Sequence, residues 1–132
     1  MFNVCAGFWA TWCGPCLHEI PLLKTFHEEN PAIDVVGIAV DEIDPVLEFA
    51  DEMQFNYPSL VGQTSAFDAM AVFRNDAQVM PFSVFTTASG AVLATHAGEL
   101  HPEHLAFFVE TIDLLTAGRI DLDQARERMK AN

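Results

Sequence analysis

Two cysteines separated by two residues, Cys13 and Cys16, have the clearest chemistry in this chain. They lie in the segment WCGPC, directly after an apolar stretch. Such a pair can form a structural disulfide, supply half of a metal site, or be oxidised and reduced in turn. The third cysteine, Cys5, stands apart, so the sequence excludes both a dense disulfide framework and a four-cysteine zinc site.

The elements expected around this pair favour a redox role. Residues 2–9 (FNVCAGFW) are typical of a buried strand, and Pro15 stands where proline is favoured at the start of a helix. The helix N-terminus would direct free N–H groups at Cys13, which stabilises a thiolate. Cys16 would lie one turn deeper and could displace a partner bound to Cys13. A disulfide closing so short a loop gains little entropy, and the two histidines of this helix lack metal-ligand spacing.

Glu19 is a candidate proton acceptor for this pair. It follows Cys16 by three residues, which places both on one face of the helix. Helical side chains lean toward the N-terminus, so the carboxylate would point back at Cys16. Partial desolvation would raise its pKa into a range suited to proton transfer. The alternative is an exposed first-turn glutamate that the helix dipole stabilises.

The rest of the pattern predicts an α/β sandwich with a small mixed sheet. The first helix should be kinked by Pro21 and end at Asn30-Pro31. Further along we expect a strand over 34–40, a helix over about 45–53, an extended piece YPSLVG, a helix SAFDAMAVF, a hairpin of FSVFTT and AVLATHAG, a helix from His101 toward Gly118, and a last helix LDQARERMK. We expect one domain over 1–132, with a C-terminal helical extension over about 119–132.

Composition narrows the classes of function. The chain has 132 residues and a net charge of −13, so binding to nucleic-acid phosphates is disfavoured. No apolar run approaches the roughly 20 residues of a membrane span. No secretory signal is visible, but the abrupt start is compatible with the removal of an upstream leader or anchor.

The segment FWATWCGPCLHEIP, with VVGIAVDE and NYP after it, resembles the TlpA/ResA-like branch of the thioredoxin superfamily over about residues 2–104. The resemblance implies a thioredoxin-like α/β/α sandwich with a helical insert after the second strand. It also implies a thiol–disulfide oxidoreductase that reduces protein disulfides without a metal or an organic cofactor. The implied partners are protein thiols and disulfides and a thioredoxin-like electron donor. We expect a monomer that is periplasmic or tethered facing the periplasm, with the cytoplasm as the alternative.

The resemblance also assigns the reactive residues. Cys13 resembles the nucleophile, Cys16 the resolving thiol, and Glu19 the functional glutamate of a CxxCxxE pattern. Thioredoxin itself carries a buried aspartate six residues before the nucleophile, where this chain has Gly7. Glu19 is therefore expected to replace that aspartate.

Supporting positions follow from the same resemblance. Trp12 would shield the rim of the site, and Gly14 and Pro15 would tune the reduction potential. Pro81 resembles a cis-proline facing the disulfide, and Met80 would offer its backbone to an extended substrate peptide. Two features depart from the family pattern: the strand that usually precedes the first one is missing, and the stretch FRNDAQVMP is unusual.

Other interpretations stay open at this point. A thioredoxin-fold binding module could instead pass on Cu(I) through the two thiolates, which are soft ligands. A peroxidase is less favoured, because its cysteine normally lies outside a CxxC motif. Cys5 is expected to be a buried structural thiol and His18 to face solvent. The spacing of His96, His101 and His104 does not favour a metal site, and the phenylalanines are expected in the core.

Overall fold

A computed structural model describes residues 3–130 of the chain. Its strands are β1 (Asn3–Trp9), β2 (Ile33–Val40), β3 (Ser59–Gly62), β4 (Phe82–Thr86) and β5 (Val92–Ala97). They form one mixed sheet in the order β3-β2-β1-β4-β5, in which β1, β2 and β3 are parallel, β4 is antiparallel to β1, and β5 is antiparallel to β4. The predicted α/β fold is thus confirmed. Phe2, the predicted start of the first strand, and the last two residues of the predicted extension lie outside the described residues.

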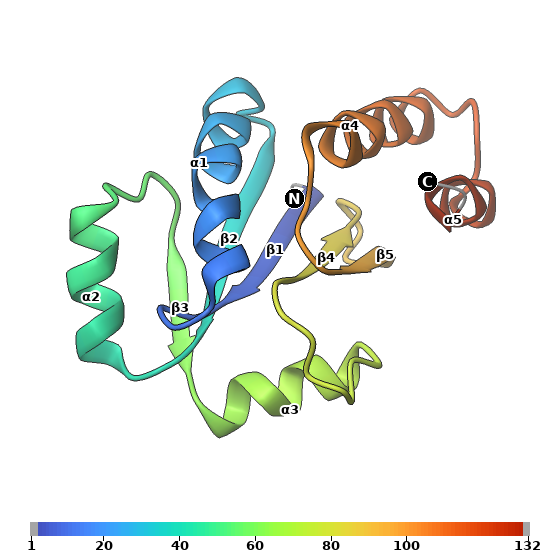
Figure 1. The fold of residues 1–132 in the computed structure, drawn as a ribbon. Coiled ribbons are helices and arrows are strands. Elements are labelled where there is room, and N and C mark those ends of the chain that lie inside the picture. Colours follow the sequence, from blue (N-terminus) through green and yellow to red (C-terminus); the bar gives the residue numbers. More distant parts are fainter. Residues whose placement is uncertain (1–2, 131–132) are drawn as a thin grey trace.

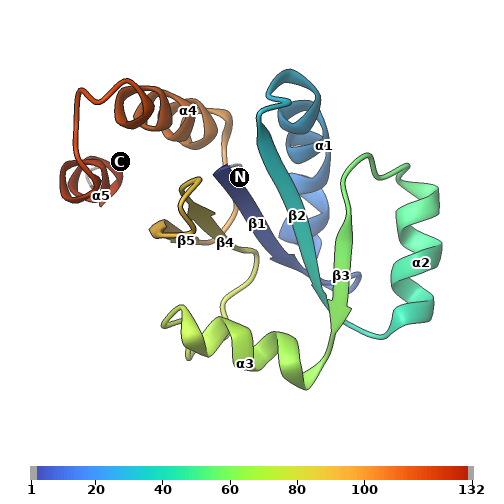
Figure 2. The ribbon, with the colours of Figure 1, turned by 180° about the vertical axis from the view of Figure 1, so that it is seen from behind.

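Helices cover both faces of this sheet (Figure 1). They are α1 (Gly14–Glu29), α2 (Ile43–Glu52), α3 (Thr64–Val72), α4 (Pro102–Thr116) and α5 (Leu122–Lys130). Figure 2 shows the same ribbon from behind, with the strands now in front of α1. The helical insert after β2 and the extra C-terminal helix are both present. No helix within residues 3–130 has the length and apolarity needed to cross a bilayer.

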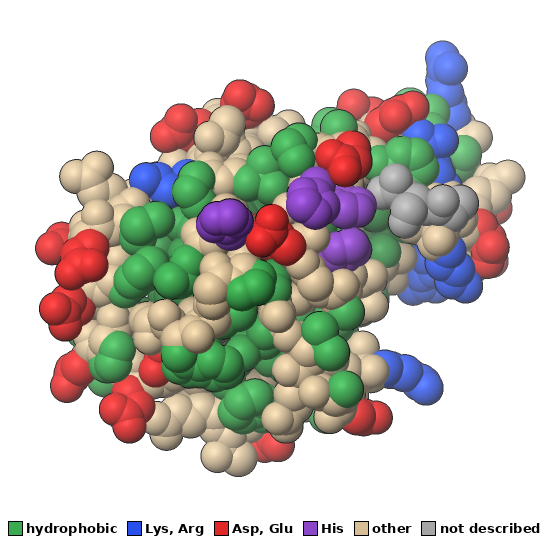
Figure 3. Space-filling view, in the orientation of Figure 1, with side chains coloured by type: hydrophobic (Ala, Val, Ile, Leu, Met, Phe, Trp, Pro, Cys, Tyr) green, Lys and Arg blue, Asp and Glu red, His purple; other side chains and the backbone are tan. Residues whose placement is uncertain are grey.

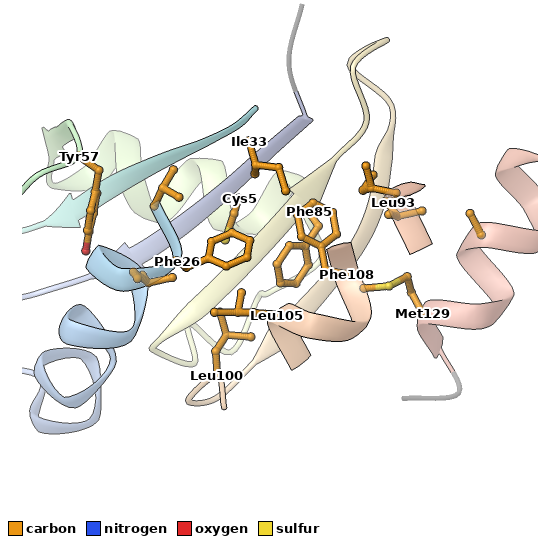
Figure 4. Packing of buried hydrophobic residues seen from close by; sticks show 14 residues of the cluster. Cys5, Phe26, Ile33, Tyr57, Phe85, Leu93, Leu100, Leu105, Phe108 and Met129 are labelled. Carbon is orange, nitrogen blue, oxygen red and sulfur yellow. The ribbon is translucent and has the colours of Figure 1, made fainter. Parts of the chain in front are cut away.

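Alternating side chains of the strands build two apolar layers. Cys5 and Phe85 are paired in register between β1 and β4, and both pack with residues of α1 and α4 in the main core (Figure 4). Three positions further along β1, Phe8 is paired with Phe82; this pair points to the opposite face and packs with Met70 of α3. The sheet is therefore held between α1 and α4 on one face and α3 on the other.

β3 forms the sheet edge beside β2. The extended piece YPSLVG thus contributes the edge strand, which runs parallel to β2 with Gly37 opposite Ser59. The indole N–H of Trp9 donates to Ser59 Oγ at 3.0 Å. A Cβ at position 37 would lie 2.8 Å from that hydroxyl and 3.0 Å from the indole nitrogen. Gly37 therefore allows the contact that ties the end of β1 to the edge strand.

α5 is attached to the body of the sheet by its basic side chains. Arg126 Nε donates to the carbonyl of Val92 on β5, and Arg128 Nε donates to Thr111 Oγ1 on α4, each at 3.0 Å. Met129 is buried in the main core. The last helix thus completes the packing on the side of the sheet formed by the hairpin.

Candidate active site

The two cysteines close a disulfide at the junction of β1 and α1. Their Cα atoms are 5.3 Å apart. Cys13 is the N-cap residue of α1, with extended backbone angles, and Cys16 lies in the first helical turn. The sequence GP between them places a proline in that first turn, where its missing N–H costs no helical hydrogen bond.

The two sulfur atoms have different surroundings. Cys13 Sγ accepts a hydrogen bond from the backbone N–H of Cys16 at 3.3 Å, at the positive end of the α1 dipole. Cys13 is 8% exposed and Cys16 only 1%. The same groups that bond the Cys13 sulfur in the disulfide stabilise a thiolate there after reduction. An incoming reagent therefore meets Cys13 first.

The rim of the site is apolar and prominent. Trp12 is 64% exposed, and Gly14 and Pro15 are exposed beside it. On the other side, Met80 packs against the apolar cluster that contains Cys13 and Cys16. The Met80–Pro81 peptide bond is cis, and Pro81 is buried. The structure thus brings the predicted rim residues and the Met80–Pro81 segment to one end of the sheet.

Asp41 braces the turn that leads into the cysteines. Its Oδ2 accepts from the backbone N–H of Thr11 at 3.0 Å and from the Thr11 hydroxyl at 2.5 Å. Its Oδ1 accepts from the N–H of Glu42 at 2.8 Å. Burial alone would raise the pKa of Asp41, but these hydrogen bonds hold it below its usual range. The residue that follows β2 is thereby hydrogen-bonded to the turn before Trp12. This contact was not predicted from the sequence.

Asn75 organises the unusual stretch before Pro81. Its side-chain amide donates to the carbonyl of Val79 at 2.9 Å, and its Oδ1 accepts from the N–H of Val79 at 3.1 Å. Asn75 is only 7% exposed, whereas Val79 is 42% exposed. The two bonds hold in one shape the loop that leads to Met80, which packs against the cluster containing the disulfide.

Replacing Asn75 with alanine should lower the free energy of unfolding by about 2 kcal/mol, because two backbone groups lose their partner. Urea denaturation of the disulfide form would measure this loss. Asp76→Ala is the matched control, since Asp76 is the exposed neighbour in the same loop. Equal stability of the two variants would show that Asn75 does not hold the loop.

Glu19 lies buried on α1, one helical turn after Cys16, with 4% of its surface exposed. This excludes the alternative of an exposed first-turn glutamate. Its Oε2 accepts a hydrogen bond from the backbone N–H of Leu100 at 2.7 Å. Burial raises the pKa of Glu19 to about 7; the Leu100 bond acts against this rise, and Glu99 adds to it. The carboxyl can therefore gain and lose a proton near neutral pH.

Gly7 provides the space for this carboxylate. A Cβ at position 7 would lie 3.9 Å from Glu19 Oε1 and 3.6 Å from Leu23 Cδ1. The acidic group of α1 thus reaches the strand position at which the resemblance to thioredoxin would place an aspartate. Two carboxylates of like charge would compete for this buried space.

Leu100 is a further residue of this site that was not predicted from the sequence. It contributes a backbone N–H rather than a side chain, and it lies 81 residues from Glu19. Gly98, at φ 106°, precedes it in the turn after β5 and is the one signal in this stretch that marks an unusual backbone. A glycine at this position indicates a turn, but it does not indicate that a nearby backbone N–H bonds to a carboxylate.

The remaining candidates fall outside the immediate site. Cys5 is buried, and burial, followed by the charge of Glu19, raises the pKa of its thiol. The side chain of His18 is 85% exposed, as expected. His96, His101 and His104 lie close together, with ring centroids 4.5 Å apart for His96 and His104. Residues 3–130 contain no group of three or more His, Cys, Asp or Glu side chains arranged to hold a metal ion.

Comparison with known proteins places this arrangement in a family. The model of the Redoxin family matches residues 4–107. Among curated proteins, the thiol–disulfide oxidoreductase ResA of Oceanobacillus iheyensis is 33% identical over 59 residues, covering 42% of this chain and 31% of that protein. ResA of Halalkalibacterium halodurans is 25% identical over 114 residues, covering 83% of this chain and 62% of that protein. The chain thus spans less than two thirds of the length of these relatives.

Among solved structures, a thioredoxin-related protein from Neisseria meningitidis serogroup B is 29% identical, with a TM-score of 0.72 and coverage of 84% of each chain. The resemblance to the ResA-like branch is confirmed by these relatives. Because the family model spans most of the sheet and both cysteines, this chain belongs to the Redoxin family, within the thioredoxin superfamily.

Proposed function

We propose that this protein is a thiol–disulfide oxidoreductase that reduces disulfides in other proteins. The observation that carries the proposal is the Cys13–Cys16 disulfide, with its outer sulfur at the N-terminus of α1 and its inner sulfur buried. This arrangement gives the two thiols unequal roles. The names of the ResA relatives support the same reaction class.

In the first step the Cys13 thiolate attacks one sulfur of a substrate disulfide. A mixed disulfide forms between Cys13 and the substrate, and the other substrate sulfur leaves as a thiolate. Trp12 and Met80 lie beside the attacking Cys13 sulfur, and Gly14 and Pro15 set the spacing of the two cysteines. The backbone of Met80 would pair with an extended substrate segment, as in strand addition.

In the second step Cys16 displaces the substrate. Its thiol gives a proton to the Glu19 carboxylate, and the resulting thiolate attacks Cys13 Sγ. The Cys13–Cys16 disulfide forms, the second substrate sulfur leaves as a thiolate, and two electrons have passed to the substrate. A pKa of about 7 for Glu19 suits this transfer, since the carboxyl is partly ionised at neutral pH.

The natural partners follow from this chemistry. The substrates are protein disulfides, and a thioredoxin-like dithiol domain returns the protein to its reduced form. The protein acts as a monomer and needs no further cofactor. Resemblance to the ResA-like branch supports a position in the periplasm or on a membrane facing it.

The equilibrium reduction potential of the Cys13–Cys16 pair tests the proposed direction. Trp fluorescence in dithiothreitol or glutathione buffers should follow the transition, because Trp12 adjoins Cys13. We expect a value at or below about −230 mV, as for reducing members of the superfamily. A value near about −120 mV would assign the oxidising direction instead. Cys16→Ser is the control, since it cannot form the pair.

A further inference from the structure

A single peptide group lies between the buried carboxylate and a histidine. The N–H of Leu100 donates to Glu19 Oε2 at 2.7 Å, and the carbonyl oxygen of Glu99 lies 3.3 Å from His96 Nε2. These N–H and C=O groups belong to the same peptide unit. Because that unit is planar and trans, fixing the direction of its carbonyl also fixes the direction of its N–H.

The chemistry of the carbonyl contact defines the state of the histidine. A carbonyl oxygen only accepts hydrogen bonds, so His96 Nε2 must carry the proton. Both the Nε2–H tautomer and the imidazolium meet this requirement. His96 is half-buried on β5, with its ring against that of His104, so its orientation is restricted by packing as well as by the bond.

The strands align the histidine with the pocket of Glu19. Gly7 is paired with Ser83, and Ser83 with His96, so these three positions form one row across the sheet. Directly paired residues share a face, and Gly7 lies beneath the Glu19 carboxylate on that face. His96 is thus at the outer end of a row whose inner end is the carboxylate pocket. Figure 3 shows histidine side chains gathered in one patch beside the segment that joins β5 to α4.

The Leu100 N–H is the only hydrogen-bond donor that residues 3–130 provide to the Glu19 carboxylate. Other titratable groups near Glu19 and His96 act by charge or burial. Those near Glu19 are Cys5 of β1, Tyr57 before β3, and Glu99. Those near His96 are His101 and His104 at the start of α4, and Lys130 of α5. None of these side chains replaces the peptide N–H as a donor to the carboxylate.

We propose that His96 is a positioning residue: by donating from Nε2 to the carbonyl oxygen of Glu99, it holds the Leu100 N–H against Glu19 and so favours the ionised carboxylate. The effect of His96 on catalysis rests on the role of Glu19 in the proposed function. The chain of contacts from His96 through the Glu99–Leu100 peptide to Glu19 does not depend on that role. A hydrogen bond to a charged carboxylate lowers its pKa. Loss of the His96 bond should therefore raise the pKa of Glu19.

The test is a pH titration of the Glu19 side-chain carboxyl carbon by ¹³C NMR in the disulfide form. The Glu19 resonance is the one absent from Glu19→Gln. In His96→Phe, which keeps a ring but removes the donor, the midpoint should rise by about half a unit, a threefold change in the dissociation constant. The Leu100 amide should exchange with solvent at least about tenfold faster. His96→Gln, which keeps a side-chain N–H, should restore both values toward those of the native protein.

His18→Phe is the matched control. Its Nδ1 lies 3.8 Å from the Glu99 carboxylate, so the variant removes an imidazole near the same residue without affecting the carbonyl. We expect no change in either value. An unchanged Glu19 midpoint in His96→Phe, with or without faster exchange at Leu100, would overturn the proposal.

A measurement on the native protein guards against variants that fail to fold. The ¹⁵N shifts of His96 should show a protonated Nε2 across the pH range in which the protein is folded. A neutral ring with the proton on Nδ1 would contradict the link directly. These readouts do not depend on turnover. If Glu19→Gln retained full activity, the proposed role of Glu19 would fail while the His96 link could still be judged.

Discussion

Cys13→Ser should lower the rate of disulfide exchange by at least about 10³-fold, because a hydroxyl cannot replace the attacking thiolate. The helix N-terminus and the Cys16 N–H would still surround position 13, but no thiolate would be present for them to stabilise. Reduction of a small protein disulfide, followed by the release of free thiols, would measure the loss. The residual rate should equal that of the uncatalysed exchange.

Two further variants identify the order of the thiols. Cys16→Ser should still attack substrate and should accumulate a stable mixed disulfide at position 13, visible by mass spectrometry. Cys5→Ala should retain exchange activity, since Cys5 is buried in the main core. If the mixed disulfide accumulated in Cys13→Ser and not in Cys16→Ser, the assigned order would be reversed.

Glu19→Gln should remove a loss of stability that the native protein shows as the pH rises. Burial raises the pKa of Glu19 from an ordinary 4.5 to about 7 in the folded chain. Between these values the folded state binds more protons than the unfolded state, so the free energy of unfolding falls with increasing pH. The fall is complete above about pH 7 and amounts to about 3 kcal/mol. Glutamine does not titrate, so the Glu19→Gln variant does not show this fall in the free energy of unfolding.

Urea denaturation of the disulfide form at several pH values from 4 to about 8.5 would measure this effect. The difference in unfolding free energy between the variant and the native protein should shift in favour of the variant by up to about 3 kcal/mol across that range. Glu29→Gln serves as the control, because Glu29 is an exposed glutamate of the same helix. Parallel curves for native protein and Glu19→Gln would show that Glu19 has no raised pKa.

Local sequence signals were sufficient for the part of the fold that carries the cysteines. The apolar run before Trp12, the proline at Pro15 and the β-branched stretch of β2 predict β1, α1 and β2, and all three are present. α2 begins at Ile43, two residues before the predicted start. Pro45 therefore lies within the first turn, where its missing N–H has no helical acceptor to lose. Pro21 lies inside α1, and the kink expected there stays a prediction.

The partners of the site residues were beyond the reach of sequence patterns. The burial of Glu19 depends on a backbone N–H from the segment after β5, and the turn before Trp12 depends on a carboxylate at the end of β2. Such contacts arise only when the strand order is known, because the residues involved are far apart in the chain. Asn75 acts within its own loop, but its bonds to Val79 depend on the loop shape and not on a recognisable motif.

The unequal burial of the two sulfur atoms has a kinetic consequence. In the proposed exchange, Cys16 is too deeply buried for a protein partner to reach. The substrate disulfide and the dithiol that reduces the Cys13–Cys16 disulfide again must therefore both react at Cys13. The two partners therefore occupy the same small area around Trp12 in alternation and never together. Turnover of this kind is ping-pong, and an excess of either partner competes with the other for one shared docking position.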